Sequence, residues 1–243
     1  MAMRRVALLP ALLVAAALNS GASAADLPTK TPAVAPLVAP TWTGFYGGLA
    51  VGYGWGTSEQ TDLTIFGAFS SGEYNIDGAI LGGTLGYNWQ AGAAVFGVET
   101  DLSWASIKGS TVGTGALGAC IGFRCESEIQ ALGTLRGRLG YAWGNWLPYI
   151  TGGLAYARLH GVEGPAGGLG GAGAKWVAGW TIGGGVEAMI ARNWSMKLEY
   201  LFVDLGKHAV WTNTVGIATP ATESLDTTAH VVRLGLNYHF TTW

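Results

Sequence analysis

Eight charged residues are the side chains of this chain that could carry chemistry, because each lies in a segment where polar and apolar residues alternate. They are Glu99, Asp101, Arg136, Arg138, Glu187, Lys197, Glu199 and Arg233. A spacing of two residues, as between Glu99 and Asp101, places both side chains on one face of a strand. Four carboxylates and four cations on one inner face would either pair and close a passage, or line a charged constriction that solutes cross.

Catalysis and metal binding have weak support in the sequence. One grouping, His230 with Ser224 and Glu223, combines a base, a nucleophile and a carboxylate, but no catalytic motif surrounds it. No HExxH pattern or Cys/His cluster accompanies the histidines, of which His160, His208 and His230 are expected near outer loops. We therefore expect no catalytic residues, no metal site and no cofactor, and we keep haem or metal capture at the surface as an alternative.

The segment 193–206, NWSMKLEYLFVDLG, shows which element must position the charged residues. Its even positions are apolar or aromatic from Trp194 to Phe202, whereas its odd positions include Lys197 and Glu199. A period of two predicts a strand, and a wholly apolar face of this length predicts one that crosses a membrane. Similar segments are expected at 43–56, 77–89, 94–107, 127–143, 147–159, 176–190 and 229–240, although the faces of 147–159 cannot be assigned.

The predicted connections between these strands alternate in length. Turns of two to four residues follow the second, fourth and sixth strands, whereas the segments 57–73, 108–126, 160–175 and 205–228 form long loops. Short periplasmic turns opposite long outer loops are typical of an outer-membrane barrel, as are aromatic girdles at two heights. The expected girdle residues are Trp55, Trp89, Trp104, Trp143, Trp176, Trp194, Phe202, Tyr238 and Phe240, with Tyr149 also placed at the periplasmic side.

The composition and the ends agree with an exported protein. Arg4 and Arg5, an apolar run over 6–18 and the residues Ala22-Ser23-Ala24 predict a signal peptide over 1–24. A proline at every fourth position from Pro28 predicts an extended periplasmic linker over 25–41, which leaves 42–243 for the barrel. Removing the two arginines leaves 11 Lys+Arg against 15 Asp+Glu, a charge that argues against nucleic acid as a partner.

Several motifs resemble a known family. The segments 43–48 (TGFYGG), 52–56 (GYGWG), 147–149 (LPY) and 193–206 resemble the small outer-membrane β-barrels of alphaproteobacteria, which include OmpA-like, porin-family major surface proteins and antigens. The resemblance covers nearly all of the mature chain, and its motifs mark scaffold rather than chemistry. Such barrels normally end in an aromatic residue that the outer-membrane assembly machinery recognises. Here Thr241, Thr242 and Trp243 follow Phe240, which is a departure from that pattern.

The predicted fold is therefore all-β, an eight-stranded antiparallel transmembrane up-and-down barrel in the outer membrane of a Gram-negative bacterium. We expect Glu99 and Asp101 to lie near Arg136 and Arg138, and Lys197 and Glu199 near Arg233, so that ion pairs close the lumen. The predicted function is structural: support of the envelope, contact with outer-membrane lipid and lipopolysaccharide, and surface interactions with host or environmental ligands. The alternatives are a narrow porin for small solutes and a loop-mediated adhesin or haem-binding protein.

The two cysteines form a separate feature. Four residues separate Cys120 from Cys125 in the long segment 108–126. The envelope is oxidising and further metal ligands are missing nearby, so we expect a disulfide that constrains the tip of this loop.

Overall fold

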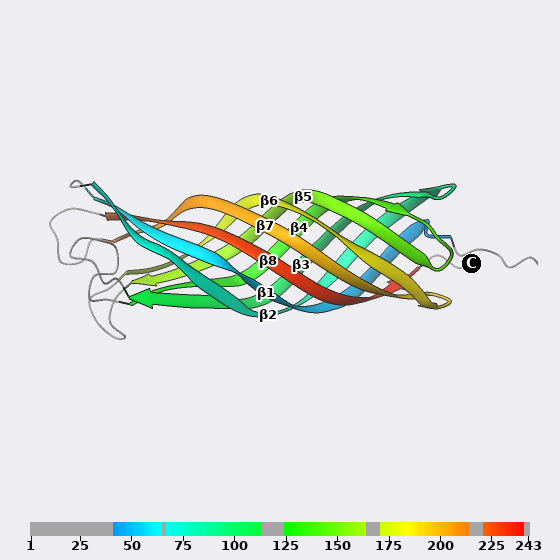
Figure 1. Cartoon of the computed structure of the whole chain (residues 1–243), viewed down its shortest axis with the longest axis horizontal. Coiled ribbons are helices and arrows are strands. Elements are labelled where there is room, and N and C mark those ends of the chain that lie inside the picture. Colours follow the sequence, from blue (N-terminus) through cyan, green and yellow to red (C-terminus); the bar gives the residue numbers. More distant parts are fainter. Residues whose placement is uncertain (1–40, 65–66, 113–123, 164–170, 214–220, 241–243) are drawn as a thin grey trace, which may run out of the picture. The chain divides into compact units, whose positions relative to one another are not determined.

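The computed structural model describes residues 41–64, 67–112, 124–163, 171–213 and 221–240, and all of them belong to one compact unit, Val38–Trp243. Eight strands form a closed barrel in which every strand pairs with its neighbours in the chain and β1 pairs with β8 (Figure 1). The strands are β1 (Gly44–Thr64), β2 (Gly67–Ala91), β3 (Ala94–Val112), β4 (Arg124–Tyr141), β5 (Trp146–Glu163), β6 (Gly171–Ala191), β7 (Trp194–Asn213) and β8 (Ala221–His239).

The predicted fold class is confirmed: the sheet is all-antiparallel and up-and-down. β7 shows the alternation most clearly, since Leu198 on its even face is 57% exposed whereas Glu199 beside it is 2% exposed. No helix among the described residues has the length and apolar character needed to cross a membrane. The signal peptide over 1–24 and nearly all of the linker over 25–41 lie outside the described residues and stay predictions.

The four long loops were predicted too long, because the strands continue well past the expected girdle. β1 runs on to Thr64 and β2 begins again at Gly67, so most of the segment 57–73 is strand. Strands also extend into the other three segments, where β3, β5 and β7 continue to Val112, Glu163 and Asn213. The extensions carry polar residues such as Glu73 and Lys108 on their exposed outer face. The apolar outer face that predicts a membrane strand therefore ends before the strand itself does.

Two assignments of side chains to faces are also wrong. The alternation that predicts Arg136 and Arg138 inward also predicts Gln130 inward and Ile129 outward, but Ile129 is 1% exposed and Gln130 is partly exposed. A register irregularity between Ile129 and Ala131 in the pairing with β5 switches the faces at this point. Tyr149 was placed in the girdle, but the odd residues of β5 face inward and Tyr149 is 5% exposed.

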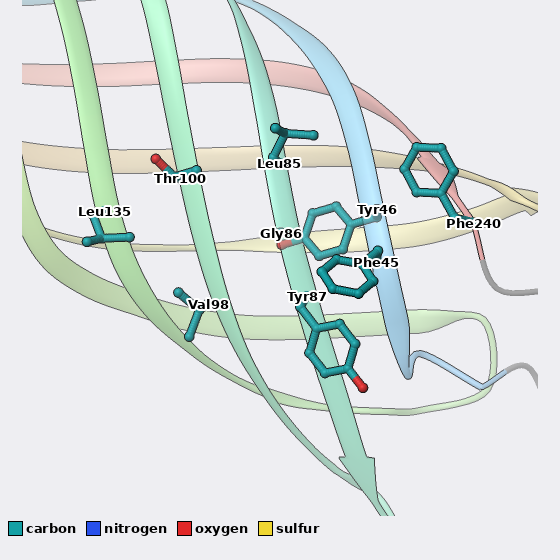
Figure 2. Close-up of a pocket in the computed structure, with 9 residues that line it drawn as sticks. All are labelled: Phe45, Tyr46, Leu85, Gly86, Tyr87, Val98, Thr100, Leu135 and Phe240. Carbon is teal, nitrogen blue, oxygen red and sulfur yellow. The ribbon is translucent and has the colours of Figure 1, made fainter.

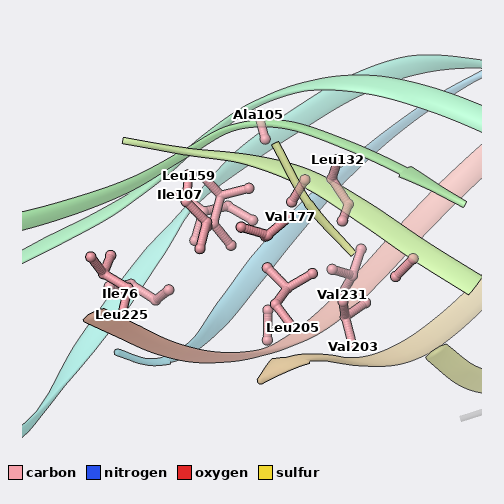
Figure 3. Packing of buried hydrophobic residues seen from close by; sticks show 14 of the residues in the cluster. Ile76, Ala105, Ile107, Leu132, Leu159, Val177, Val203, Leu205, Leu225 and Val231 are labelled. Carbon is pink, nitrogen blue, oxygen red and sulfur yellow. The ribbon is translucent and has the colours of Figure 1, made fainter. Parts of the chain in front are cut away.

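Buried apolar side chains lie on both sides of the charged residues along the barrel. At the end with the short turns, Trp42, Val95, Leu147 and Met189 form one cluster. On the other side, a larger cluster occupies the interior of the extended strands (Figure 3). Its central members, labelled in Figure 3, include Ile107, Leu159 and Leu205 from three different strands. Along the barrel, the interior therefore consists of an apolar layer, a charged layer and a second apolar layer.

The larger cluster should contribute strongly to stability. Replacing Ile107, which is 0% exposed, by alanine should lower the free energy of unfolding by about 2–5 kcal/mol because the cavity cannot collapse fully. Val112→Ala is the matched control on the same strand, since Val112 is 56% exposed and should cost at most about 0.5 kcal/mol. Urea unfolding in phospholipid vesicles, followed by tryptophan fluorescence, measures both. Equal losses would show that the cluster does not pack as described.

Candidate functional site

All eight charged residues singled out in the sequence lie in the interior of the barrel, and none is more than 4% exposed. β3 contributes two carboxylates, β4 two arginines and β7 one residue of each sign, while β6 and β8 contribute one residue each. The residues, in strand order, are Glu99, Asp101, Arg136, Arg138, Glu187, Lys197, Glu199 and Arg233. Charges this deeply buried are tolerated only when they are paired and hydrogen-bonded.

Arg136 lies at the centre of this charged layer. Its Nη2 atom is 2.5 Å from Glu99 Oε1 and 3.1 Å from Asp101 Oδ2, and its Nη1 atom is 3.0 Å from Glu199 Oε1. Glu99 is the direct cross-strand neighbour of Arg136 in the β3–β4 ladder, whereas Glu199 reaches it from β7. The planar guanidinium carries five donors, which allows one side chain to serve three carboxylates.

Other ion pairs cross the barrel rather than staying between neighbouring strands. Arg233 on β8 pairs with its cross-strand neighbour Glu199 on β7 at 2.6 Å and, across the lumen, with Asp101 on β3 at 2.9 Å. Lys197 is opposite Glu187 in the β6–β7 ladder, yet its Nζ atom lies 2.8 Å from Glu99 Oε2. The two groups expected from the sequence therefore form one connected network.

Arg138 links this network to the end with the short turns. It forms an ion pair with Glu187, and its guanidinium lies 3.9 Å from Glu99 Oε2. The guanidinium carbon also lies 3.7 Å from the centre of the Tyr149 ring, a cation–π contact. Arg138 is thus held by two carboxylates and an aromatic face.

Two tyrosines belong to the site and were missed. The Tyr46 hydroxyl donates to Glu99 Oε2 at 2.7 Å, and the Tyr149 hydroxyl donates to Glu199 Oε1 at 2.8 Å. Tyr46 fits because the inward position beside it on β2 is Gly86, where an added Cβ would lie 2.3 Å from the ring (Figure 2). The sequence holds one signal for Tyr46: it is the large residue at the even positions of 43–56, which are otherwise glycine and alanine.

The grouping of Ser195, His239 and Glu187 does not have the geometry of a catalytic triad. Ser195 donates to Glu187 Oε1 at 2.5 Å and also lies 2.9 Å from His239 Nε2. Glu187 approaches the same imidazole nitrogen at 3.6 Å, so the histidine does not lie between the hydroxyl and the carboxylate as in a Ser-His-Asp arrangement. His239 is also only 4% exposed, which leaves no access for a substrate.

The fold does not bring the side chains of His230 and Ser224 together. Ser224 is buried, whereas His230 lies on the outer wall of β8, not in a loop. There it stacks on Trp55, with ring centres 5.8 Å apart, and its Nδ1 atom is 2.7 Å from the Tyr200 hydroxyl. The side chain of Glu223 lies outside the description. Within the described residues, no three His, Cys, Asp or Glu side chains are grouped so that they could hold a metal ion.

The cysteines and the girdle residues complete the predicted set. Cys125 is buried in β4, not in a loop, and Cys120 lies outside the described residues, so the disulfide stays a prediction. The girdle residues all lie on the outer wall, where Phe202 is partly exposed and packs on Trp180 at 5.5 Å. The others are exposed: Trp55, Trp89, Trp104, Trp143, Trp176, Trp194, Tyr238 and Phe240.

The outer wall between the girdles is apolar. Figure 2 shows part of it near the end of β8, a shallow hollow of about 490 Å³ lined by residues such as Phe45, Leu85 and Phe240. Phe45 and Tyr87 meet there with ring centres 4.7 Å apart. Apolar residues exposed over a whole wall would be unstable in water and are stable against lipid chains.

Comparison with known proteins gives consistent matches. The family model described as outer membrane protein beta-barrel domain matches residues 11–240. The 31 kDa outer-membrane immunogenic protein of Brucella melitensis biotype 1 is 37% identical over 245 residues, which cover 93% of this chain and 97% of the relative. The 22 kDa outer membrane protein of Rhizobium leguminosarum bv. viciae is 33% identical over 166 residues, or 68% of this chain and 65% of that protein.

Similar solved structures are more distant. The outer membrane protease OmpT from Escherichia coli has a TM-score of 0.48 and 8% identity, and the match covers 81% of this chain and 96% of that chain. A likeness at this level carries no argument about activity.

The central position of Arg136 can be tested by removing it. Arg136→Ala would leave three buried carboxylates short of a partner, so we expect a loss of about 3–5 kcal/mol in the free energy of unfolding. Arg124→Ala is the control, because its ion pair with Glu126 is 3.8 Å long and solvent-exposed and should contribute less than about 1 kcal/mol. Urea unfolding in vesicles compares the two variants. If Arg136→Ala cost no more than Arg124→Ala, the network would not stabilise the barrel.

Proposed function

The chain belongs to the outer membrane protein beta-barrel domain family and lies in the outer membrane of a Gram-negative bacterium, and from this premise we propose that it is a structural surface protein whose lumen is closed by its own side chains. Its role is to support the envelope and to present its outer end to the surroundings.

The ion-pair network that crosses the lumen is the observation that carries this proposal. An eight-stranded barrel has an interior that side chains can just fill. Here four carboxylates and four cations balance, and two ion pairs, Arg136 with Glu199 and Arg233 with Asp101, join strands that are not neighbours in the wall. A hydrated ion could pass only by separating these pairs, which would leave charges buried without partners.

The apolar layers on either side support the same conclusion. Trp42, Val95 and Leu147 are each 0% exposed at the end with the short turns. Ile107, Leu201 and Leu205 occupy the interior beyond the charged layer. A solute would have to cross both apolar layers as well as the charged one, so we favour a closed lumen over a narrow porin.

The outer wall is the proposed contact surface for membrane lipid and lipopolysaccharide. Its exposed apolar residues suit acyl chains, and the tryptophans at its two borders suit the interfaces. Phe240 is 62% exposed beside Tyr238 at the end of the last strand, where we propose that the assembly machinery binds. Trp243 lies outside the described residues.

Interaction with a host or environmental ligand is the second part of the proposal. The Brucella relative is named immunogenic, which supports exposure at the cell surface for the family. The strand extensions beyond the girdle, with polar residues such as Glu73 and Lys108 on their outer face, are the part of this chain that would make such contacts.

A closed lumen predicts that the protein does not conduct ions. The purified protein, refolded and inserted into planar lipid bilayers, should give no stepwise current at moderate voltage, because the charged and apolar layers exclude hydrated ions. A general porin recorded in the same bilayers shows that insertion events would be detected. Steady openings of the wild type would contradict the closed lumen and favour the narrow porin.

A structural role predicts a defect of the envelope in a deletion strain. Loss of the protein should raise sensitivity to sodium dodecyl sulfate while the uptake of a small sugar stays the same, and the intact gene should restore resistance. Reduced sugar uptake in an intact envelope would instead support a pore.

A further inference from the structure

The barrel wall is not paired along its whole length. Between β2 and β3 the described register ends at Asp77 and Lys108, and between β6 and β7 it ends at Trp180 and Asp204. The other ladders continue almost to the strand ends; the last pair between β5 and β6, for example, is Glu163 with Gly171. Two seams without ladder pairs therefore run toward the outer end of the barrel, and the seam beside β6 includes the level of the girdle residue Trp176.

These seams divide the outer end into two sheets of four strands. One consists of β7, β8, β1 and β2, and the other of β3, β4, β5 and β6. At the left end of Figure 1 the strand ends of the two groups separate. Their inner faces meet through the larger apolar cluster and through polar contacts such as Tyr74 with Ser127 at 2.5 Å. Within the described residues, the outer end is thus a small β-sandwich whose four edge strands, β2, β3, β6 and β7, have no ladder partner along the seams.

Three of these edges are short or irregular. β2 carries Gly72 at a φ of 72° next to a register shift in its pairing with β1. β7 shifts register twice and bends at Gly206, where φ is 62° and Asp204 Oδ1 accepts the amide hydrogen bond. β3 extends only from Gly109 to Val112 beyond its last pair. Bulges and short edges of this kind prevent an added strand from pairing.

The edge of β6 is long and regular. From Gly171 to Gly179 it pairs with β5 without a register shift, and its residues in this range are mostly glycine and alanine. His208 Nε2 donates to Ala178 O at 3.0 Å from the β7 side, so the backbone groups of even-numbered residues point into the seam. Among the described residues, the amides of Ala172, Ala174 and Trp176 have no ladder partner on this side.

From this geometry we propose that the edge of β6 between Gly171 and Gly179 binds an extended, carboxylate-bearing peptide segment of another protein, which adds as a ninth strand. Unpaired backbone groups of a regular edge are the chemistry that recognises an extended peptide. The proposal specifies the surface-interaction part of the proposed function and rests on it.

The surroundings of this edge fit a peptide with acidic side chains. Lys175 and Arg158 are exposed cations on β6 and the adjoining β5, and Lys175 Nζ already reaches across the seam to Ala209 O at 2.9 Å. Asp204 is the nearest carboxylate on β7, and its Oδ1 atom accepts from Gly206 N at 2.8 Å. Small side chains at Ala172 and Ala174 leave room for the longer side chains of a partner to lie over β6.

Ala174→Pro tests the proposal, because proline removes the backbone amide of residue 174, which faces the seam. The hydrogen bonds of the β5–β6 ladder are left in place. Ala174→Ser is the matched control, since it keeps that amide. The probe is a fluorescein-labelled peptide of alternating threonine and glutamate, with a threonine–lysine peptide as the charge control. Fluorescence anisotropy on the full-length protein in nanodiscs measures binding to each variant.

The acidic peptide should bind the wild type and Ala174→Ser alike, and Ala174→Pro should bind it at least about tenfold more weakly. Equal binding to all three variants, or none to the wild type, would overturn the proposal. So would dimerisation of the wild type that Ala174→Pro abolishes, since the edge would then serve a second copy of this chain.

A measurement on the wild type keeps the test independent of whether Ala174→Pro folds. With the acidic peptide bound, hydrogen exchange at Ala172, Ala174 and Trp176 should slow at least about tenfold, whereas exchange at Val177, which faces β5, should not change. No slowing at the three amides would contradict strand addition. The planar-bilayer result does not depend on this edge, so failure of the closed lumen and failure of peptide binding can be told apart.

Discussion

A charge buried inside a membrane-spanning barrel must find a partner, and this constraint explains the interior of the molecule. Arg136 is 1% exposed and is stabilised by carboxylates from β3 and β7, so removing either strand would leave it without adequate compensation. Arg233 makes the corresponding link from β8 to β3. The network therefore fixes opposite parts of the wall relative to each other, which ladder hydrogen bonds between neighbours cannot do.

The same wall meets three environments along its length. Between the girdles the outer face is apolar, as at Leu49, which is 70% exposed. Beyond the outer girdle the outer face becomes polar and the inner face becomes aliphatic. The strands therefore keep their two-residue alternation, but the apolar residues now point inward and the polar residues outward. A barrel with a charged interior thereby continues into a sandwich with an apolar interior, and one sheet serves lipid at one end and water at the other.

The sequence predicted the fold class because eight segments repeat the same two-residue alternation and the turns between them alternate in length. Lys197 and Glu199 could be assigned to one inner face from their spacing alone, but their partners could not be assigned. The contact of Lys197 with Glu99 crosses the lumen, and nothing in local spacing encodes the distance across a closed ring. Tyr149 was misplaced because β5 is apolar on both faces, and Ile129 because a register irregularity changes the faces within one strand.

The span of the charged network in the sequence has a consequence for assembly. Arg233 and Asp101 are 132 residues apart and meet only when β8 has joined β1 and the ring is complete. Until then Asp101 and Glu199 lack one of their cations, and an open sheet would carry this imbalance into hydrocarbon at considerable cost. Closure of the ring and neutralisation of its interior are therefore a single cooperative event, so the last strand to be synthesised also completes the electrical balance of the barrel.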